Sequence, residues 1–137
     1  MKPESLHLLN AAQGQLSEGR AVLTINSPEL AGRAAYLAAL LAARAFIHER
    51  TGRERTGRIA KTHRGTRVAF LELTAGGEAF DREQRGFLAW AYRLKTIADY
   101  EVAPRRVVSS VQASTALDTA ARFVPRIAAV LEDRPDA

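Results

Sequence analysis

The sequence of 137 residues is 47% hydrophobic, contains no cysteine and carries a formal net charge of +5 at pH 7. This length and apolar content suit one domain with a real core, and the lack of cysteine excludes disulfides, thiolate zinc sites and a cysteine nucleophile. The first residues lack the apolar segment of a signal peptide, and no stretch approaches roughly 18 uninterrupted apolar residues, which argues against a membrane span. We therefore expect a soluble, cytoplasmic protein whose basic excess favours an anionic partner.

Alanine occurs 26 times and no segment alternates with a period of two, so the sequence predicts an all-α fold. A first helix is expected at about 3–17, with Gly19 as its stop. Ser27 and Pro28 predict the start of a second helix, because serine can cap free amide groups and proline suits the first helical position. Nearly all sides of this second helix are apolar, which is typical of a central helix.

A basic segment with two Thr-Gly pairs follows the second helix. Between Arg50 and Arg67 there are seven Arg and Lys residues but only one acidic residue, Glu54. A short third helix is expected at about 62–73, with its apolar side chains turned toward the core, namely Val68, Leu71 and Phe70.

Two capping boxes mark the remaining helices, because a Ser or Asp three residues before a Gln can satisfy free amide groups at a helix start. Asp81 with Gln84 predicts a fourth helix that ends near Tyr100, and Ser109 with Gln112 predicts a fifth. The whole chain, 1–137, is expected to form one helical domain. Its core should span about 27–131, followed by a frayed tail at 132–137.

The ionisable residue most suggestive of chemistry is His63, because it stands at a predicted helix start among basic residues. Helix N-termini and arginines both favour phosphate. A histidine there can act as general base or acid on a ribose hydroxyl or leaving oxygen, while an arginine stabilises charge on the phosphate. The alternative is a polar residue at a helix start, bonded to a neighbouring backbone group or carboxylate. The basic neighbours expected to contact phosphate or nucleic acid are Arg53, Lys61, Arg64 and Arg67.

A second polar group is expected near this segment. Arg33 lies in an alanine-rich helix, where a charge must find a partner or reach solvent. Asp99 can be that partner, or it can pair with Lys95 one turn earlier. With Tyr100, these residues predict a supporting polar pocket; the alternative is a structural ion pair beside a half-buried tyrosine.

The other candidate residues have structural interpretations. His7 and His48 are expected to be structural, and none of the three histidines is spaced with carboxylates as a zinc motif requires, so no metal site and no cofactor are expected. Trp90 and Tyr92 are expected to be core or dimer contacts rather than platforms on which bases stack.

Four runs, RAAYLAALLAARAFI, KTHRGT, AYRLKTIADYE and ARFV, occur in this order. Together they resemble the HEPN domain family of small prokaryotic helical proteins. The resemblance implies a four- to five-helix up-and-down bundle, usually dimeric, often encoded with a minimal nucleotidyltransferase as a toxin–antitoxin pair. Many such relatives are metal-independent ribonucleases that use an Arg, four to six intervening residues and a His. Arg58 and His63 stand at this spacing and become the candidate catalytic residues.

Three hypotheses follow. The first is a HEPN-type toxin–antitoxin or defence protein that acts on RNA, as a metal-independent endoribonuclease in its catalytic form. The second is a non-catalytic HEPN module that binds a nucleotide or a nucleotidyltransferase partner. The third is a purely structural helical homodimer.

Overall fold

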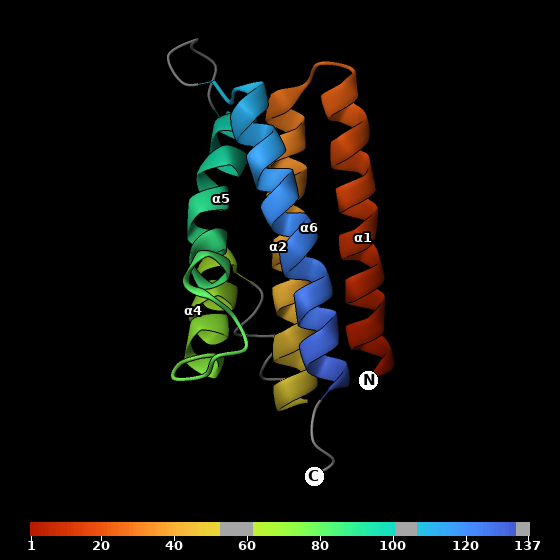
Figure 1. Ribbon diagram of the computed structural model, residues 1–137, viewed down its shortest axis with the longest axis vertical. Helices are drawn as coiled ribbons and strands as arrows, with labels where there is room; N and C mark the ends of the chain where they lie inside the picture. The colour runs from red at the N-terminus through yellow and green to blue at the C-terminus, as the bar shows by residue number, and fades with distance from the viewer. Residues whose placement is uncertain (53–61, 101–106, 134–137) are drawn as a thin grey trace.

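The computed structural model describes residues 1–52, 62–100 and 107–133 and contains five helices in these ranges and no strand. They are α1 (Pro3–Thr24), α2 (Pro28–Thr51), α4 (His63–Leu73), α5 (Arg82–Tyr100) and α6 (Ser110–Glu132). The four long helices alternate in direction, and the short α4 lies beside the lower end of α5 (Figure 1). The prediction of an all-α fold is confirmed.

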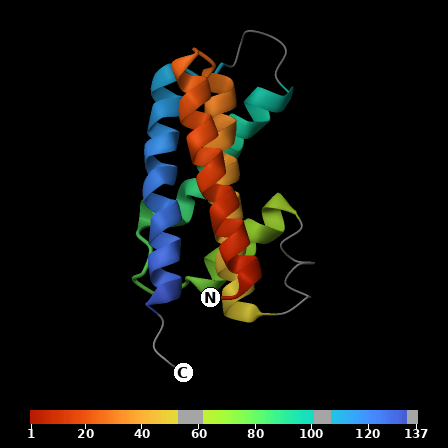
Figure 2. The same ribbon diagram turned by 90° about the vertical axis from the view of Figure 1, so that its right-hand side faces the viewer.

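Helix α2 is the centre of the bundle, because it packs against α1, α4, α5 and α6. Its alanines let these neighbours approach closely, and many of them are fully buried, including Ala35, Ala38, Ala39 and Ala42. By length and composition α2 could cross a membrane, with a mean hydropathy of 1.5, but 72% of its apolar window is buried within the bundle. The core helix of a soluble protein has these same properties. Helices α1, α2 and α6 run side by side along the molecule (Figures 1 and 2).

The predicted end of the first helix was wrong. Helix α1 continues through Gly19 to Thr24, and the chain turns at Asn26, which has a left-handed φ of 67°. A Cβ atom at position 19 would lie 2.7 Å from Leu117 Cδ2 and 3.1 Å from Ala34 Cβ. Gly19 therefore allows α1 to approach α2 and α6 closely instead of stopping the helix.

The other predicted helix starts agree with the structure. Pro28 begins α2, although the Ser27 side chain makes no capping hydrogen bond. Both capping boxes are formed: Gln84 N donates to Asp81 Oδ1 at 2.7 Å, and the box at Ser109 is complete. Helix α6 ends at Glu132, and residues 134–137 of the predicted tail lie outside the described ranges.

Within the described residues, the core is a single apolar cluster to which all five helices contribute. Its aromatic centre is Phe70 with Phe46, Phe80 and Phe123, whose ring centroids lie 5.2 to 5.6 Å from that of Phe70. The expectation that Val68 faces the core was wrong, since this side chain is 38% exposed. Thr66, Ala69 and Phe70 form the buried side of α4 instead, so the face that packs is rotated away from Val68.

Candidate functional site

A small cavity of about 150 Å³ opens where α2, α4 and α5 meet. We call it the His63 pocket. Its walls combine aromatic, cationic and aliphatic side chains: Tyr36, His63, Arg64, Arg67, Leu88 and Tyr92.

Three of these side chains come from the start of α4. His63 is the first residue of α4, and the Thr62 hydroxyl before it accepts a hydrogen bond from Gly65 N at 2.8 Å. Arg64 and Arg67 follow in the first turns of α4. No acidic residue lies in the first turn, so the positive end of the helix dipole is not neutralised locally.

Tyr36 fixes the ring of His63. Its hydroxyl oxygen lies 2.7 Å from His63 Nδ1, and the rings of Tyr36 and Tyr92 lie 5.5 and 5.3 Å from the His63 ring. Burial raises the pKa of Tyr36 well above its ordinary value, so the phenol keeps its proton at neutral pH. A buried hydroxyl requires an acceptor for this proton, and Nδ1 is the one that the geometry offers. We infer that Tyr36 donates to Nδ1 and that the neutral ring carries its proton on Nε2.

The ionisation of His63 is shifted toward the neutral form. Partial burial lowers the pKa of His63, and the positive charges of Lys95 and Arg44 lower it further, while Asp99 acts in the opposite direction. The ring is therefore neutral at pH 7, although its surroundings are basic. Arg44 is itself held in place, since its Nε donates to Thr66 Oγ1 at 3.2 Å.

The four residues of the predicted supporting pocket lie together. Asp99 Oδ1 accepts from Arg33 Nε and Asp99 Oδ2 pairs with Lys95 Nζ, both at 2.8 Å. Asp99 thus has both of the partners that the sequence offered as alternatives. Lys95 Nζ lies 5.4 Å from the centroid of the Tyr100 ring, and Tyr100 is 68% exposed rather than half-buried. The hydrogen bond from Lys95, followed by that from Arg33, lowers the pKa of Asp99.

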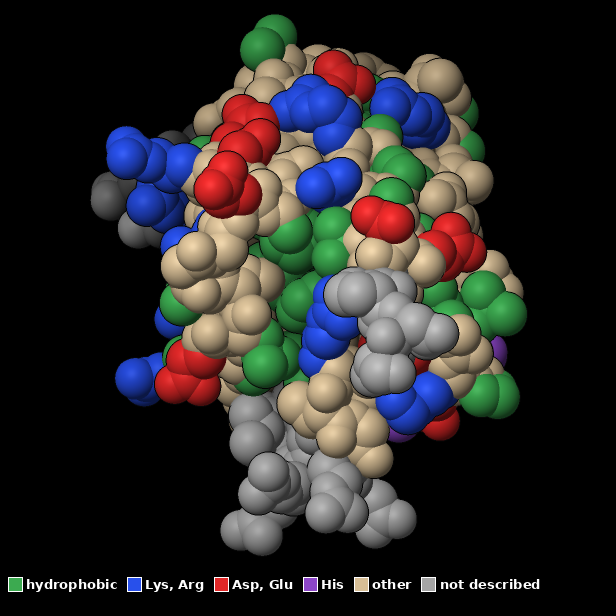
Figure 3. Space-filling view, turned by 60° about the horizontal axis from the view of Figure 1, so that its bottom comes forward, with side chains coloured by type: hydrophobic (Ala, Val, Ile, Leu, Met, Phe, Trp, Pro, Cys, Tyr) green, Lys and Arg blue, Asp and Glu red, His purple; other side chains and the backbone are tan. Residues whose placement is uncertain are grey.

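We call Arg33, Lys95 and Asp99 the ion cluster. The ion cluster and the His63 pocket both contain residues of α2 and α5. On α5, Leu88, Tyr92, Lys95 and Asp99 recur at spacings of four and three and so lie along one face. On α2, Arg33 precedes Tyr36 by one turn. Lys and Arg side chains also project at the left edge of the space-filling view, the side on which α4 and α5 lie (Figure 3).

Three predicted residues, Arg53, Arg58 and Lys61, lie outside the described ranges. Three residues of the pocket, Leu88, Tyr36 and Tyr92, were not predicted as site residues. The signal for the two tyrosines was available as helical spacing, since Tyr36 follows Arg33 and Tyr92 precedes Lys95 by three positions. Within the described ranges, no group of three or more His, Asp or Glu side chains could hold a metal ion.

Comparison with known families agrees with this architecture. The model of the HEPN domain matches residues 5–129, which is most of the chain and includes all the described residues of the His63 pocket and the ion cluster. No curated protein matches the sequence. Because the family match extends over far more than half of the length, this chain belongs to the HEPN domain family.

Proposed function

We propose that the protein acts on RNA in the cytoplasm as one component of a toxin–antitoxin or defence system, and that the His63 pocket holds a phosphate of the RNA backbone. The observation that carries this proposal is a neutral, fixed histidine at the unneutralised N-terminus of α4, in a pocket with Arg64 and Arg67. Arginines, a helix N-terminus and an N–H donor are the groups that bind phosphate in proteins.

In this arrangement His63 donates a hydrogen bond to the phosphate. With Nδ1 accepting from Tyr36, the proton on Nε2 is free to donate to a phosphate oxygen. A bound phosphodiester also favours the imidazolium form, so binding raises the pKa of His63 from its lowered value.

In the catalytic version of this proposal, the same pocket cleaves the RNA that it binds. The 2′-oxygen loses its proton and attacks the neighbouring phosphorus, the bond to the 5′-oxygen breaks, and that oxygen takes up a proton from water. The products are a 2′,3′-cyclic phosphate and a 5′-hydroxyl, and no metal is needed. This step uses the tautomer opposite to the one inferred for the free protein. With Nδ1–H donating to the Tyr36 oxygen, His63 accepts the 2′-proton at Nε2, and Arg58 stabilises the charge on the phosphate.

The test combines binding and cleavage in one set of proteins. Purified chain is incubated with single-stranded RNA in EDTA, and products are analysed for a cyclic phosphate. We expect cleavage by the wild type and its loss in His63→Ala and Arg58→Ala, with DNA of the same sequence left intact. Expression of the wild type, but not of His63→Ala, should slow growth and degrade cellular RNA.

A charge-matched control separates the pocket from general basicity. Arg64→Ala with Arg67→Ala should weaken RNA binding at least tenfold. Arg20→Ala with Arg126→Ala, which also removes two arginines but in α1 and α6, outside the pocket, should not. RNA that stays intact at high protein concentration would contradict the proposed cleavage. Equal RNA binding by all variants would contradict the proposed phosphate site as well.

The non-catalytic alternative has one observation in its favour. The tautomer inferred from Tyr36 leaves His63 a donor rather than a base, which suits a module that binds a nucleotide or a minimal nucleotidyltransferase partner. This alternative expects a stable complex when the chain is co-expressed with such an enzyme, and no RNA cleavage. The expected homodimer is tested by light scattering of the purified chain.

A further inference from the structure

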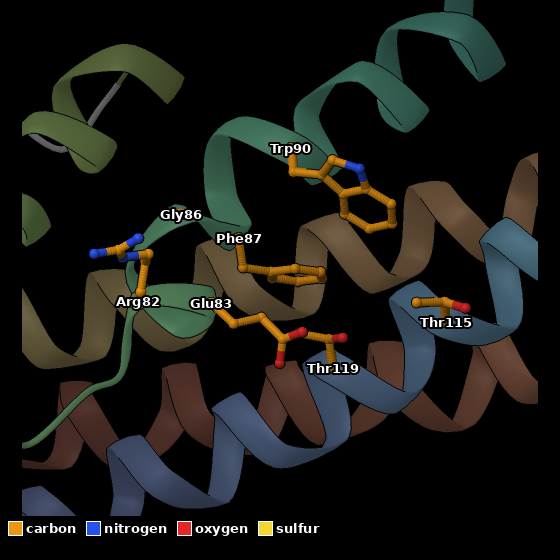
Figure 4. A pocket seen from close by; sticks show the side chains of 7 residues that line it. All are labelled: Arg82, Glu83, Gly86, Phe87, Trp90, Thr115 and Thr119. Carbon is orange, nitrogen blue, oxygen red and sulfur yellow. The ribbon is translucent and has the colours of Figure 1, made fainter.

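A second cavity, of about 310 Å³, lies between α5 and α6 (Figure 4). We call it the α5–α6 cavity. It is distinct from the His63 pocket, because Phe87 and Trp90 of α5 line it, whereas Leu88 and Tyr92 line the other. Its walls are mainly apolar, and its volume is at the lower end of the range of small-molecule sites, roughly 300–1,000 Å³. This volume suits one ring system rather than a bulky ligand.

One wall of the cavity is aromatic. The Trp90 ring lies 5.9 Å from that of Phe87, with their planes tilted by 35°. Phe87 is buried, but Trp90 is 36% exposed, which is unusual for the largest apolar side chain of the protein. Figure 4 shows both rings facing α6 across the cavity. A partly exposed indole supported by a buried ring offers a surface on which a planar ligand can stack.

The opposite wall carries a hydroxyl that is open to the cavity. Thr119 of α6 is 4% exposed, lines the cavity and makes no hydrogen bond with any part of the chain that the structure describes. Its hydroxyl oxygen is accessible from the cavity rather than enclosed in the core, so a ligand in the cavity can reach it. Thr115, one turn earlier, lines the cavity as well. The Thr119 hydroxyl can both donate and accept, so it suits the polar edge of a ring.

The rim of the cavity does not select an anion. Two charged residues line the rim. Glu83 is bonded to Arg122, with Glu83 Oε1 2.6 Å from Arg122 Nη2, and the guanidinium of Arg82 points away from Trp90 and Thr119 (Figure 4). The ligand that fits is therefore uncharged, flat on its faces and able to form hydrogen bonds at its edge.

We propose that the α5–α6 cavity binds a nucleobase, which stacks on Trp90 and hydrogen-bonds with Thr119. The choice of a nucleobase over another planar ring rests on the proposed action on RNA. Every base has a face that stacks on an aromatic side chain, and such stacking tolerates differences in sequence. The site would accept either a free nucleoside or a base of RNA.

Trp90 is the only tryptophan in the sequence, so fluorescence excited selectively at tryptophan, and not at the three tyrosines, comes from this cavity. Purified chain is titrated with adenosine, guanosine, cytidine and uridine, which carry no phosphate and so do not depend on the His63 pocket. We expect saturable quenching by at least one of them. Thr119→Val, which keeps the shape and removes the hydroxyl, should weaken binding about fivefold.

Gly86 allows the cavity to be blocked without damage to the core. It lines the cavity, and a Cβ atom there meets nothing within 4 Å, so Gly86→Leu should fill the space and abolish quenching. Gly14→Leu is the matched control, because Gly14 is equally open but lies in α1, outside the cavity. This control should bind nucleosides as the wild type does.

Three results would overturn the proposal: no saturable quenching by any nucleoside, equal quenching in Gly86→Leu, or a Trp90 signal that depends on protein concentration alone. The last would mean that a second copy covers Trp90. Oligoribonucleotides with and without a single abasic position distinguish a base of RNA from a free nucleoside. Arg64→Ala with Arg67→Ala should leave nucleoside quenching unchanged, so failure of the phosphate site and failure of this site give different results.

Discussion

The ionisation of His63 depends on charges that α2 and α5 bring to the start of α4. Lys95 and Arg44 oppose its protonation, and Asp99 favours it. This balance places a neutral imidazole in a basic pocket, where it can donate through Nε2 or, as the other tautomer, accept a proton.

Replacing Asp99 by asparagine should therefore lower the pKa of His63 further. The substitution removes the one negative charge that favours the imidazolium and leaves Lys95 without its ion-pair partner. The measurement is an NMR titration of the His63 ring protons in wild type and Asp99→Asn. His7 and His48 serve as internal references. An unchanged or raised His63 pKa would show that Asp99 does not act on this ring.

Protein stability should fall with acidification in a way that depends on His63. Its pKa in the folded state is lowered, so the unfolded chain, with a histidine pKa of about 6.5, binds more protons as the pH falls through that value. Stability is lost from about pH 6.5 down to the folded-state pKa and is fully present above. Urea unfolding from pH 5 to 8 should show this slope in the wild type and a smaller slope in His63→Ala. Parallel curves would contradict the lowered pKa.

Charge density along the sequence was enough to point to His63, Arg64 and Arg67, but not to Tyr36. A tyrosine in an alanine-rich helix looks like a core residue, and its partner lies 27 positions later in the chain. The contact exists only because α4 docks on α2. Short-range spacing cannot reveal a pair that depends on such docking.

Helix starts that depend on local hydrogen bonds could be predicted from the sequence, but the role of a glycine that packs against other helices could not. Capping boxes were predicted correctly because their hydrogen bonds join residues three positions apart, as in Asp81 with Gln84. The prediction that Gly19 ends the helix was wrong. Glycine is needed there because Leu117 of α6 and Ala34 of α2 pack closely against this position. Local sequence cannot distinguish a glycine that ends a helix from one that permits close packing.

Alanine at positions 14 and 19 should consequently have opposite effects. Gly19→Ala places a methyl group 2.7 Å from Leu117 Cδ2 and should lower the free energy of unfolding by roughly 1–3 kcal/mol. Gly14→Ala meets nothing within 4 Å and should raise it by about 0.5–1 kcal/mol through helix propensity. Urea denaturation of both variants measures the difference. Stabilisation by both would mean that α1 does not pack closely at Gly19.

At the scale of the molecule, the start of the chain is tied to the end of the central helix. Lys2 N donates to Glu49 Oε1 and Lys2 Nζ donates to the Glu49 carbonyl oxygen, both at 2.9 Å. Burial alone would raise the pKa of Glu49, but the hydrogen bond from Lys2 and nearby positive charges lower it overall. This contact closes the hairpin of α1 and α2.

Glu49→Gln should lower the free energy of unfolding by about 1–2 kcal/mol at pH 7, since a buried charged hydrogen bond is replaced by a neutral one. The lowered pKa means that the stabilisation is present above the unfolded-state value of about 4.3 and is lost as the pH falls through the folded-state pKa. Wild type and variant should therefore converge in acid. Thermal unfolding at pH 7 and pH 3 tests this, and a constant difference would exclude a role for the charge.

We propose that RNA places a phosphate beside His63. The most direct measurement is the NMR titration of the three histidines in the presence and absence of a short single-stranded RNA at low salt. We expect that RNA shifts the His63 ring resonances and raises the His63 pKa, that the His7 and His48 resonances hardly shift, and that Arg64→Ala with Arg67→Ala removes the effect. RNA binding that leaves the His63 resonances and pKa unchanged would contradict this proposal.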